Sequence, residues 1–154
     1  MNNGSQACEL CTTSGGETLW ESPACRVIRV DDPHYPGFFR VIWNAHIREM
    51  SDIDSAQQQY LMSVVFVVES VVRHFFKPDK INLASFGNMV PHLHWHVIAR
   101  WSDDRHFPEP IWGSVNNSGS PKRPIVSNSE FAKALALALK NKETLGPLDH
   151  EYGD

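Results

Sequence analysis

Residues 92–100 have the sequence HLHWHVIAR, in which histidine alternates with leucine, tryptophan and valine. Side chains on a β-strand alternate between its faces, so we expect Leu93–Trp101 to be a strand with the three imidazoles on one face. Leu93, Trp95 and Val97 are then expected to enter the core. Histidines two residues apart lie about 6.6 Å apart along a strand, close enough to contact one phosphate-sized ligand.

The histidine row suggests proton and phosphate chemistry. Imidazole has an unperturbed pKa near 6.5, so such a row supplies a neutral nucleophile beside a charged proton donor. A solvated histidine-rich strand, or one buried and hydrogen-bonded imidazole, is the alternative explanation. The apolar residues between the histidines argue against a surface tract.

Short apolar and β-branched segments elsewhere indicate further strands. Leu19–Val30 and Phe38–Trp43 are bounded by Gly, Pro and Asp, and a loop rich in proline separates them. Ile81–Phe86 is predicted as a strand next to the histidine row. Strands that are sequence neighbours, with one long helix crossing between them, favour an α+β fold with an antiparallel sheet.

That long helix has a stripe with helical period at Leu61, Val64, Val65, Val68, Val71, Val72 and Phe75. Ser51–Asp54 offers residues for its N-cap, and we expect it to end before Lys77-Pro78. Phe66 and Val67 widen the apolar surface beyond the stripe, which favours a second contact, such as another subunit.

The C-terminal third has a different composition. Residues 102–128 are expected to form an irregular connection, because they contain several Asp, Asn, Ser and Gly residues and four prolines. Ser127–Glu130 is a capping box, which predicts a C-terminal helix through about Asn141. The last dozen residues are expected to be a polar tail.

The chain's length and charge exclude several classes of protein. The 154 residues suit one domain, and 14 basic against 18 acidic residues give a net charge of −4. With no basic run, we expect neither a nucleic acid nor an anionic membrane as partner, although a local site for a small phosphate ester remains compatible. We expect a cytoplasmic protein for three reasons. The chain has only three cysteines, its first residues do not resemble a signal peptide, and its most apolar run, Leu61–Val72, is too short to span a bilayer.

The motif His-Leu-His-Trp-His-Val-Ile matches the signature of the histidine triad (HIT) family at every position. The resemblance extends upstream through Gly87–Pro91 and the long helix to Cys8-Glu9-Leu10-Cys11. It covers about the first 113 residues, so we assign 5–113 to a HIT domain and 114–154 to a C-terminal extension. The resemblance implies a homodimer with a HIT-like fold.

The resemblance also implies an activity, that of a nucleotidyl hydrolase or transferase. His94 takes the position of the histidine that attacks the α-phosphorus of a nucleotide ester, anhydride or phosphoramidate. His96 can protonate the leaving group.

Three other positions are candidates for substrate binding, each with a simpler structural alternative. The amide of Asn88 could donate to a phosphoryl oxygen, or Asn88 is a turn residue after Gly87. Asp32, or its neighbour Asp31, corresponds to an acidic residue that bonds the ribose in relatives, or it initiates a turn before Pro33. Trp112 could stack on a base, or it only packs against the sheet.

The chain departs from the family pattern at two positions. Phe38 replaces a fourth active-site histidine, and Met89 replaces a serine, so a catalytically inactive nucleotide-binding dimer is the alternative function. A third hypothesis makes the triad itself a catalytic metal site, since His-x-His pairs also bind zinc.

Zinc-bearing relatives imply a structural zinc site in this chain. Their ligands match Cys8, Cys11, His46 and His92, a closed Cys2His2 set without an open position. The alternative is two ordinary free cysteines near the N-terminus. Cys25 is expected to be a small core residue.

Overall fold

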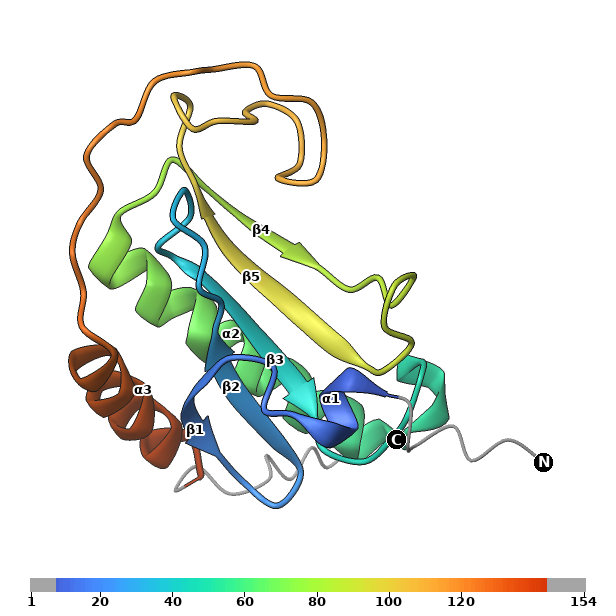
Figure 1. Ribbon diagram of the computed structural model, residues 1–154. Helices are drawn as coiled ribbons and strands as arrows, with labels where there is room; N and C mark the ends of the chain where they lie inside the picture. Colours follow the sequence, from blue (N-terminus) through green and yellow to red (C-terminus); the bar gives the residue numbers. More distant parts are fainter. Residues whose placement is uncertain (1–7, 144–154) are drawn as a thin grey trace, which may run out of the picture.

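The computed structural model describes residues 8–143, which form an antiparallel sheet with two long helices on one face and a short helix on the other (Figure 1). The strands are β1 Glu17–Glu21, β2 Cys25–Arg29, β3 Phe38–Trp43, β4 Lys80–Ala84 and β5 His94–Arg100. The helices are α1 Glu9–Thr12, α2 Ser55–Phe76 and α3 Asn128–Glu143, with a 3-10 turn at Met50–Asp52. The strand order is β1-β2-β3-β5-β4. The predicted α+β class, antiparallel sheet, crossover helix and C-terminal helix are confirmed.

The first predicted strand segment is wrong in one respect. Leu19–Val30 is not continuous, because the chain turns at residues 22–24 to form the β1–β2 hairpin. The Ser22 hydroxyl accepts hydrogen bonds from the backbone N–H groups of Ala24 and Cys25. Pro23, which has no N–H to donate to a ladder, therefore lies in the turn.

Helix α2 has the ends that the sequence predicts. Asp54 accepts a hydrogen bond from the backbone N–H of Gln57, and the Gln57 side chain accepts one from Asp54 N–H, which completes a capping box. Lys77 closes the helix in a left-handed conformation with φ of 46°. The stripe from Leu61 to Val72 is buried as expected, but Phe76 occupies the last buried position and Phe75 is only half-buried.

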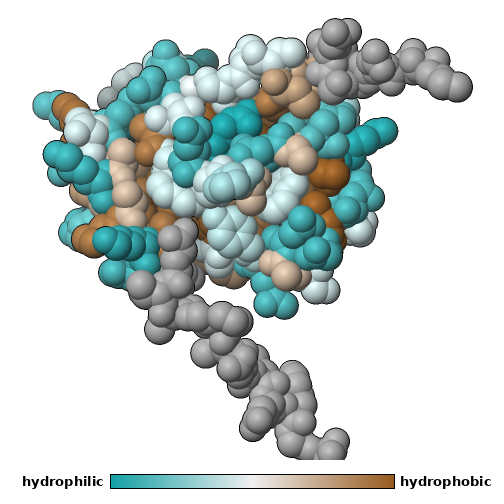
Figure 2. All heavy atoms as spheres, turned by 90° about the horizontal axis from the view of Figure 1, so that it is seen from below, coloured by the Kyte–Doolittle hydropathy of each residue, from teal (hydrophilic) through white to brown (hydrophobic). Residues whose placement is uncertain are grey.

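Of the two residues that widen the apolar surface of α2, only Phe66 is exposed, and the predicted contact with another subunit stays a prediction. Val67 is buried within the chain, whereas Phe66 is 48% exposed. By length and composition alone α2 could cross a bilayer, but its buried residues pack in the core of the protein, and core helices pass the same test. On the face seen in Figure 2, hydrophobic side chains lie in small separate patches among hydrophilic ones.

The main core lies between the sheet and the two long helices. Phe39 of β3 stacks on Phe131 of α3, with ring centroids 4.2 Å apart, and both are fully buried. The irregular connection 101–127 runs over the end of β5 and round the molecule to α3 (Figure 1). Glu130 N–H donates to the Ser127 hydroxyl, as the predicted cap requires. The domain boundary after 113 stays a prediction, and the predicted polar tail lies outside the described residues.

The opposite face of the sheet carries the histidines. Register pairs Ile42 with His94, Arg40 with His96 and Phe38 with Ile98, so these residues share one face. Leu93 and Val97 enter the main core on the other face, and Trp95 packs against it, as expected. The site is therefore built on β3 and β5, in the middle of the sheet.

Candidate functional site

The three triad histidines lie on one face of the sheet and are all buried. His94 and His96 belong to β5, while His92 precedes it. Backbone hydrogen bonds from Trp43 N–H to Leu93 O and from Leu93 N–H to Ile47 O fix the segment before β5. The expected alternation is therefore correct, and the imidazoles are enclosed rather than solvated.

His94 is held in one orientation by a backbone hydrogen bond. Its Nδ1 lies 2.5 Å from the carbonyl oxygen of His92, which can only accept, so Nδ1 carries the proton and Nε2 keeps its lone pair. Burial lowers the pKa of His94, and the charge of Arg40 lowers it further, against the effect of the hydrogen bond to His92. The neutral ring thus presents an unprotonated Nε2. Phe38 cannot hydrogen-bond to His94, so the His92 carbonyl is the group that orients the His94 ring.

His96 lies beside His94, with ring centroids 4.9 Å apart. Its Nδ1 is buried and has no hydrogen-bond partner among the described residues. Burial lowers the pKa of His96 to about 3, and the nearby ionisable ring of His94 and the charge of Arg40 act in the same direction. The ring is therefore neutral without ligand, and an anionic ligand between His94 and His96 favours its protonation.

Arg40 is a site residue that the sequence analysis missed. It is the direct cross-strand neighbour of His96, and its guanidinium carbon lies 5.6 Å from the centre of the Phe38 ring. A charged residue inside the apolar strand FFRVIW, on the same face as Phe38, was the signal available in the sequence.

Three aromatic rings lie around the ring of His96. The ring of Trp112 lies 4.9 Å from that of His96, and the rings of Phe38 and Phe86 lie 5.6 and 6.2 Å away. Trp112 was predicted near the site, whereas Phe86 was not. Trp112 and Phe86 are both about half exposed, at 52% and 56%, so this side of the site is open to solvent at these two residues.

The remaining predicted substrate residues are less clearly placed. Asn88 is exposed on the loop that begins at Gly87, and Met89 is 94% exposed. Asp32 accepts a hydrogen bond from His34 N–H at 2.9 Å, as a turn-initiating residue does. Asp31 and Asp32 also line a cavity of about 520 Å³ with Arg29 and Asn128, and no triad histidine lines it.

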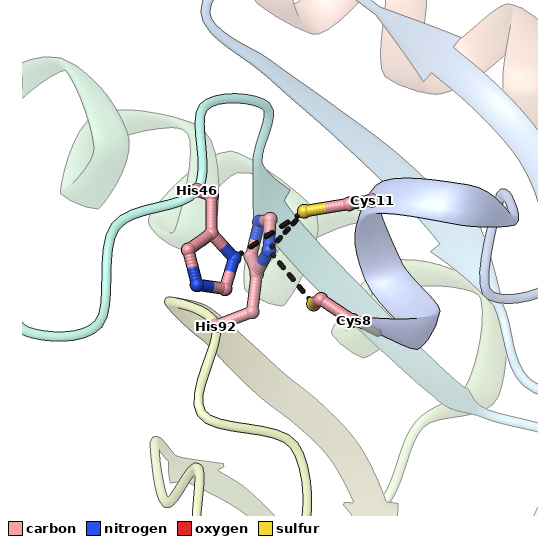
Figure 3. A group of neighbouring side chains, drawn as sticks. All are labelled: Cys8, Cys11, His46 and His92. Atoms are coloured by element: carbon pink, nitrogen blue, oxygen red, sulfur yellow. Dashed lines mark hydrogen bonds between the residues drawn. The ribbon is translucent and has the colours of Figure 1, made fainter. Parts of the chain in front are cut away.

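Cys8, Cys11, His46 and His92 form a cluster whose possible ligand atoms all lie within 4.8 Å of one another (Figure 3). The cysteines come from α1 and its N-cap, His46 follows β3, and His92 precedes β5. His92 Nε2 lies 2.5 Å from the Trp43 carbonyl oxygen, so it carries the proton and Nδ1 faces the sulfur atoms. Cys11 Sγ lies 3.3 Å from His46 Nδ1 and 3.4 Å from His92 Nδ1.

This cluster fits a tetrahedral zinc ion. Bonds of 2.3 Å to sulfur and 2.0–2.1 Å to nitrogen at tetrahedral angles put the S and N atoms about 3.5 Å apart, close to the distances in the cluster. Arg26 fixes α1 beside the sheet by donating to the Leu10 carbonyl at 2.7 Å and to Asn44 Oδ1 at 3.2 Å. The cluster includes His92 but neither His94 nor His96, so it does not support the triad as a catalytic metal site.

Comparison with known proteins agrees with this geometry. The HIT domain family matches residues 14–103, more than half of the chain. The crystal structure of a histidine triad protein from Bradyrhizobium japonicum is similar, with a TM-score of 0.61, 30% identity and coverage of 79% of this chain and 90% of that one. For a histidine triad protein from Marinobacter aquaeolei the TM-score is 0.62, with 29% identity and coverage of 86% and 92%.

Two curated relatives from strains of Mycobacterium tuberculosis bear the name AP-4-A phosphorylase. They are 27% identical to this chain over 88 residues, which is 53% of this chain and 45% of each relative. The chain thus matches less than half the length of these relatives.

Proposed function

This chain belongs to the HIT domain family, and from that premise we propose that it transfers or hydrolyses the nucleotidyl group of a nucleoside monophosphate ester, anhydride or phosphoramidate. One observation carries the proposal. The hydrogen bond from His94 Nδ1 to the His92 carbonyl leaves the lone pair of Nε2 unprotonated, in a ring whose centroid lies 4.9 Å from that of His96. A neutral, oriented imidazole is the form of histidine that attacks phosphorus.

The reaction proceeds in two displacements. His94 Nε2 forms a bond to the α-phosphorus while the bond to the leaving group breaks, and His96 gives a proton to the leaving atom. Water, or another acceptor, then displaces the nucleotide from His94. The negative phosphoryl group favours the protonated form of His96, whose pKa is low in the ligand-free protein because of burial and the nearby His94 and Arg40.

Substrate binding is assigned to the residues around this pair. Trp112 offers a half-exposed ring for stacking beside His96, and the exposed amide of Asn88 is free to donate to a phosphoryl oxygen. The ribose contact of Asp32 stays a prediction, because its carboxylate already caps a turn.

The experiment is to trap the nucleotidyl-histidine by rapid quenching and mass spectrometry. Substrates include a nucleoside 5′-phosphoramidate, a 5′-monophosphate ester and AP-4-A, the last because the curated relatives bear that name. We expect an adduct on His94 in the natural protein and none in His94→Ala, with turnover lower by several orders of magnitude. His74→Ala, an exposed histidine at the end of α2, is the matched control. Substantial turnover by His94→Ala would refute the mechanism.

A second candidate is nucleotide binding without turnover. Phe38 stands where relatives have a fourth histidine, and Met89 offers only its backbone to a ligand. The same experiment separates the two functions. Nucleotide binding without any adduct on His94 supports the second, and an adduct that forms and decays supports the first.

We also propose that the cluster of Cys8, Cys11, His46 and His92 holds a structural zinc ion. The support is the closed donor set, its S–N distances near 3.5 Å and the hydrogen bond from His92 to the Trp43 carbonyl. Bound zinc would neutralise the two thiolates and join α1 to the segments flanking β3 and β5. His94 stays outside the ligand set and remains a free base.

The working unit that we propose is a homodimer. Phe66 of α2 is 48% exposed, and β4 is an edge strand of the sheet, with backbone groups available for pairing. The small size of the apolar patch on α2 makes the strand edge the larger part of the proposed contact.

A further inference from the structure

Arg40 stands beside the reacting histidines. It pairs with His96 across the β3–β5 ladder, and directly paired residues have Cβ atoms about 5 Å apart. Its guanidinium lies over the Phe38 ring, which in turn lies 5.6 Å from the ring of His96. The positive charge of Arg40 is therefore next to His96, and it acts on both His94 and His96.

The guanidinium of Arg40 makes no hydrogen bond in the described part of the chain. Two other arginines project from the same face of the sheet, and both have partners. Arg26 donates to the carbonyl groups of Leu10, Thr13 and Ser14, and Arg100 donates to the Asp104 carboxylate. Arg40, by contrast, has a buried Nε without a partner, and its side chain is in no ion pair among the described residues.

Arg40 is partly buried, and its Nε has lost water without gaining an acceptor, which is unfavourable. Burial accordingly lowers the pKa of Arg40, with only the charge of Glu9 acting in the other direction. An anion placed against the guanidinium removes this penalty. A phosphoryl group fits this role, because two of its oxygens accept the two parallel N–H groups of a guanidinium.

We propose that Arg40 binds the phosphoryl group of the substrate, with two N–H groups donating to oxygens that do not leave. This inference rests on the proposed function for the location of the phosphoryl group beside His94. Arg40 supplies a permanent positive charge and N–H donors beside His96, where the Phe38 ring cannot donate. The site therefore selects ligands by phosphoryl charge, and Arg40 contributes little to binding of an uncharged nucleoside.

The test compares the affinities of AMP, inorganic phosphate and adenosine for four proteins by titration calorimetry. These are the natural protein, Arg40→Leu, Arg40→Lys and Arg73→Leu, which removes the same charge at an exposed position on α2. We expect Arg40→Leu to weaken AMP binding by about 10- to 100-fold, the range for a hydrogen bond to a charged group. Adenosine binding should not change. Arg40→Lys should bind AMP more tightly than Arg40→Leu does, because lysine keeps the positive charge but lacks the two parallel N–H groups of a guanidinium.

Several outcomes overturn the proposal. If Arg40→Leu weakened the binding of AMP and adenosine equally, Arg40 would contact the nucleoside and not the phosphoryl group. If a folded Arg40→Leu bound AMP with unchanged affinity, Arg40 would not contact the ligand. Absence of millimolar AMP binding by the natural protein would also refute it. Melting temperatures establish that each variant is folded, and Arg40→Lys replaces Arg40→Leu if the latter is not.

The inference and the proposed function can fail separately. If Arg40→Leu selectively loses AMP but no adduct ever forms on His94, Arg40 binds phosphoryl groups in a protein without turnover. If the adduct forms on His94 and Arg40→Leu binds AMP as well as the natural protein does, the proposed nucleotidyl transfer is supported and the proposed phosphoryl contact of Arg40 is refuted.

Discussion

Replacing Asp104 by asparagine should destabilise the protein and loosen the segment that carries Trp112. The Asp104 carboxylate is buried and lies 2.7 Å from Arg100 Nε, which donates to it. It also accepts hydrogen bonds from four further groups, namely the N–H groups of Trp101, His106 and Phe107 and the hydroxyl of Tyr35. An asparagine NH2 group at either oxygen position would face two or more donors, so no orientation satisfies them all.

The size of the effect follows from the charge and the geometry. Burial alone would raise the pKa of Asp104, but the hydrogen bonds from Arg100 and the backbone outweigh it and lower the pKa from 3.8 to about 2. This difference corresponds to about 2 kcal/mol of stability from ionisation. Asparagine also leaves the buried Arg100 unpaired, so the total loss should be about 3–5 kcal/mol.

The pH dependence has a definite sign. Because the pKa of Asp104 is lower in the folded state, its stabilisation is fully present above pH about 4 to 5 and is lost as the pH falls towards about 2. Asp104→Asn has no such group, so the stability difference between the two proteins should shrink on acidification over this range.

Urea unfolding at one fixed protein concentration, followed by far-UV circular dichroism, measures the free energy of unfolding. Asp103→Asn is the matched control, since its side chain is 61% exposed and pairs only with Arg123 on the surface. That control should lose less than about 1 kcal/mol. Equal losses in the two variants, or a loss below about 1 kcal/mol in Asp104→Asn, would refute the reasoning. A raised KM would show that the Trp112 segment has moved.

Three further predictions concern metal, assembly and substrate. Purified protein should hold about one zinc per chain by elemental analysis, and Cys8→Ser and His92→Gln should lose it while Cys25→Ser keeps it; zinc undiminished in both ligand variants contradicts the site. Sedimentation at micromolar concentration should give the mass of a homodimer, and Phe66→Asp should weaken the dimer. A mass equal to that of one chain would contradict the proposed homodimer. Trp112→Ala should weaken nucleotide binding by about tenfold if the ring stacks on a base, and unchanged affinity makes Trp112 a packing residue only.

Much of the fold could be predicted from local pattern. Phe38–Trp43 is a strand with the predicted bounds, and α2 begins and ends where the Asp54 cap and the Lys77-Pro78 pair indicate. The hairpin in Leu19–Val30 was missed because apolar pairs, Leu19-Trp20 and Val27-Ile28, lie on both sides of a short turn that only Ser22-Pro23 marks. Phe75 and Phe76 differ in burial because the helical period alone does not fix which of two neighbours faces the sheet at a helix end.

By itself the sequence determined the histidine row, its alternation and the long helix, because these depend on spacing within a short segment. The four Cys and His residues of the proposed zinc site came from the resemblance to zinc-bearing relatives, whose ligand positions this chain matches. Only the tertiary structure decided that Arg40 lies against His96, that Phe86 and Trp112 enclose the same ring, and that the His92 carbonyl orients His94. These contacts depend on the register between strands and on the path of the connection after β5. Register and path are set by packing between segments far apart in sequence, so no local pattern contains them.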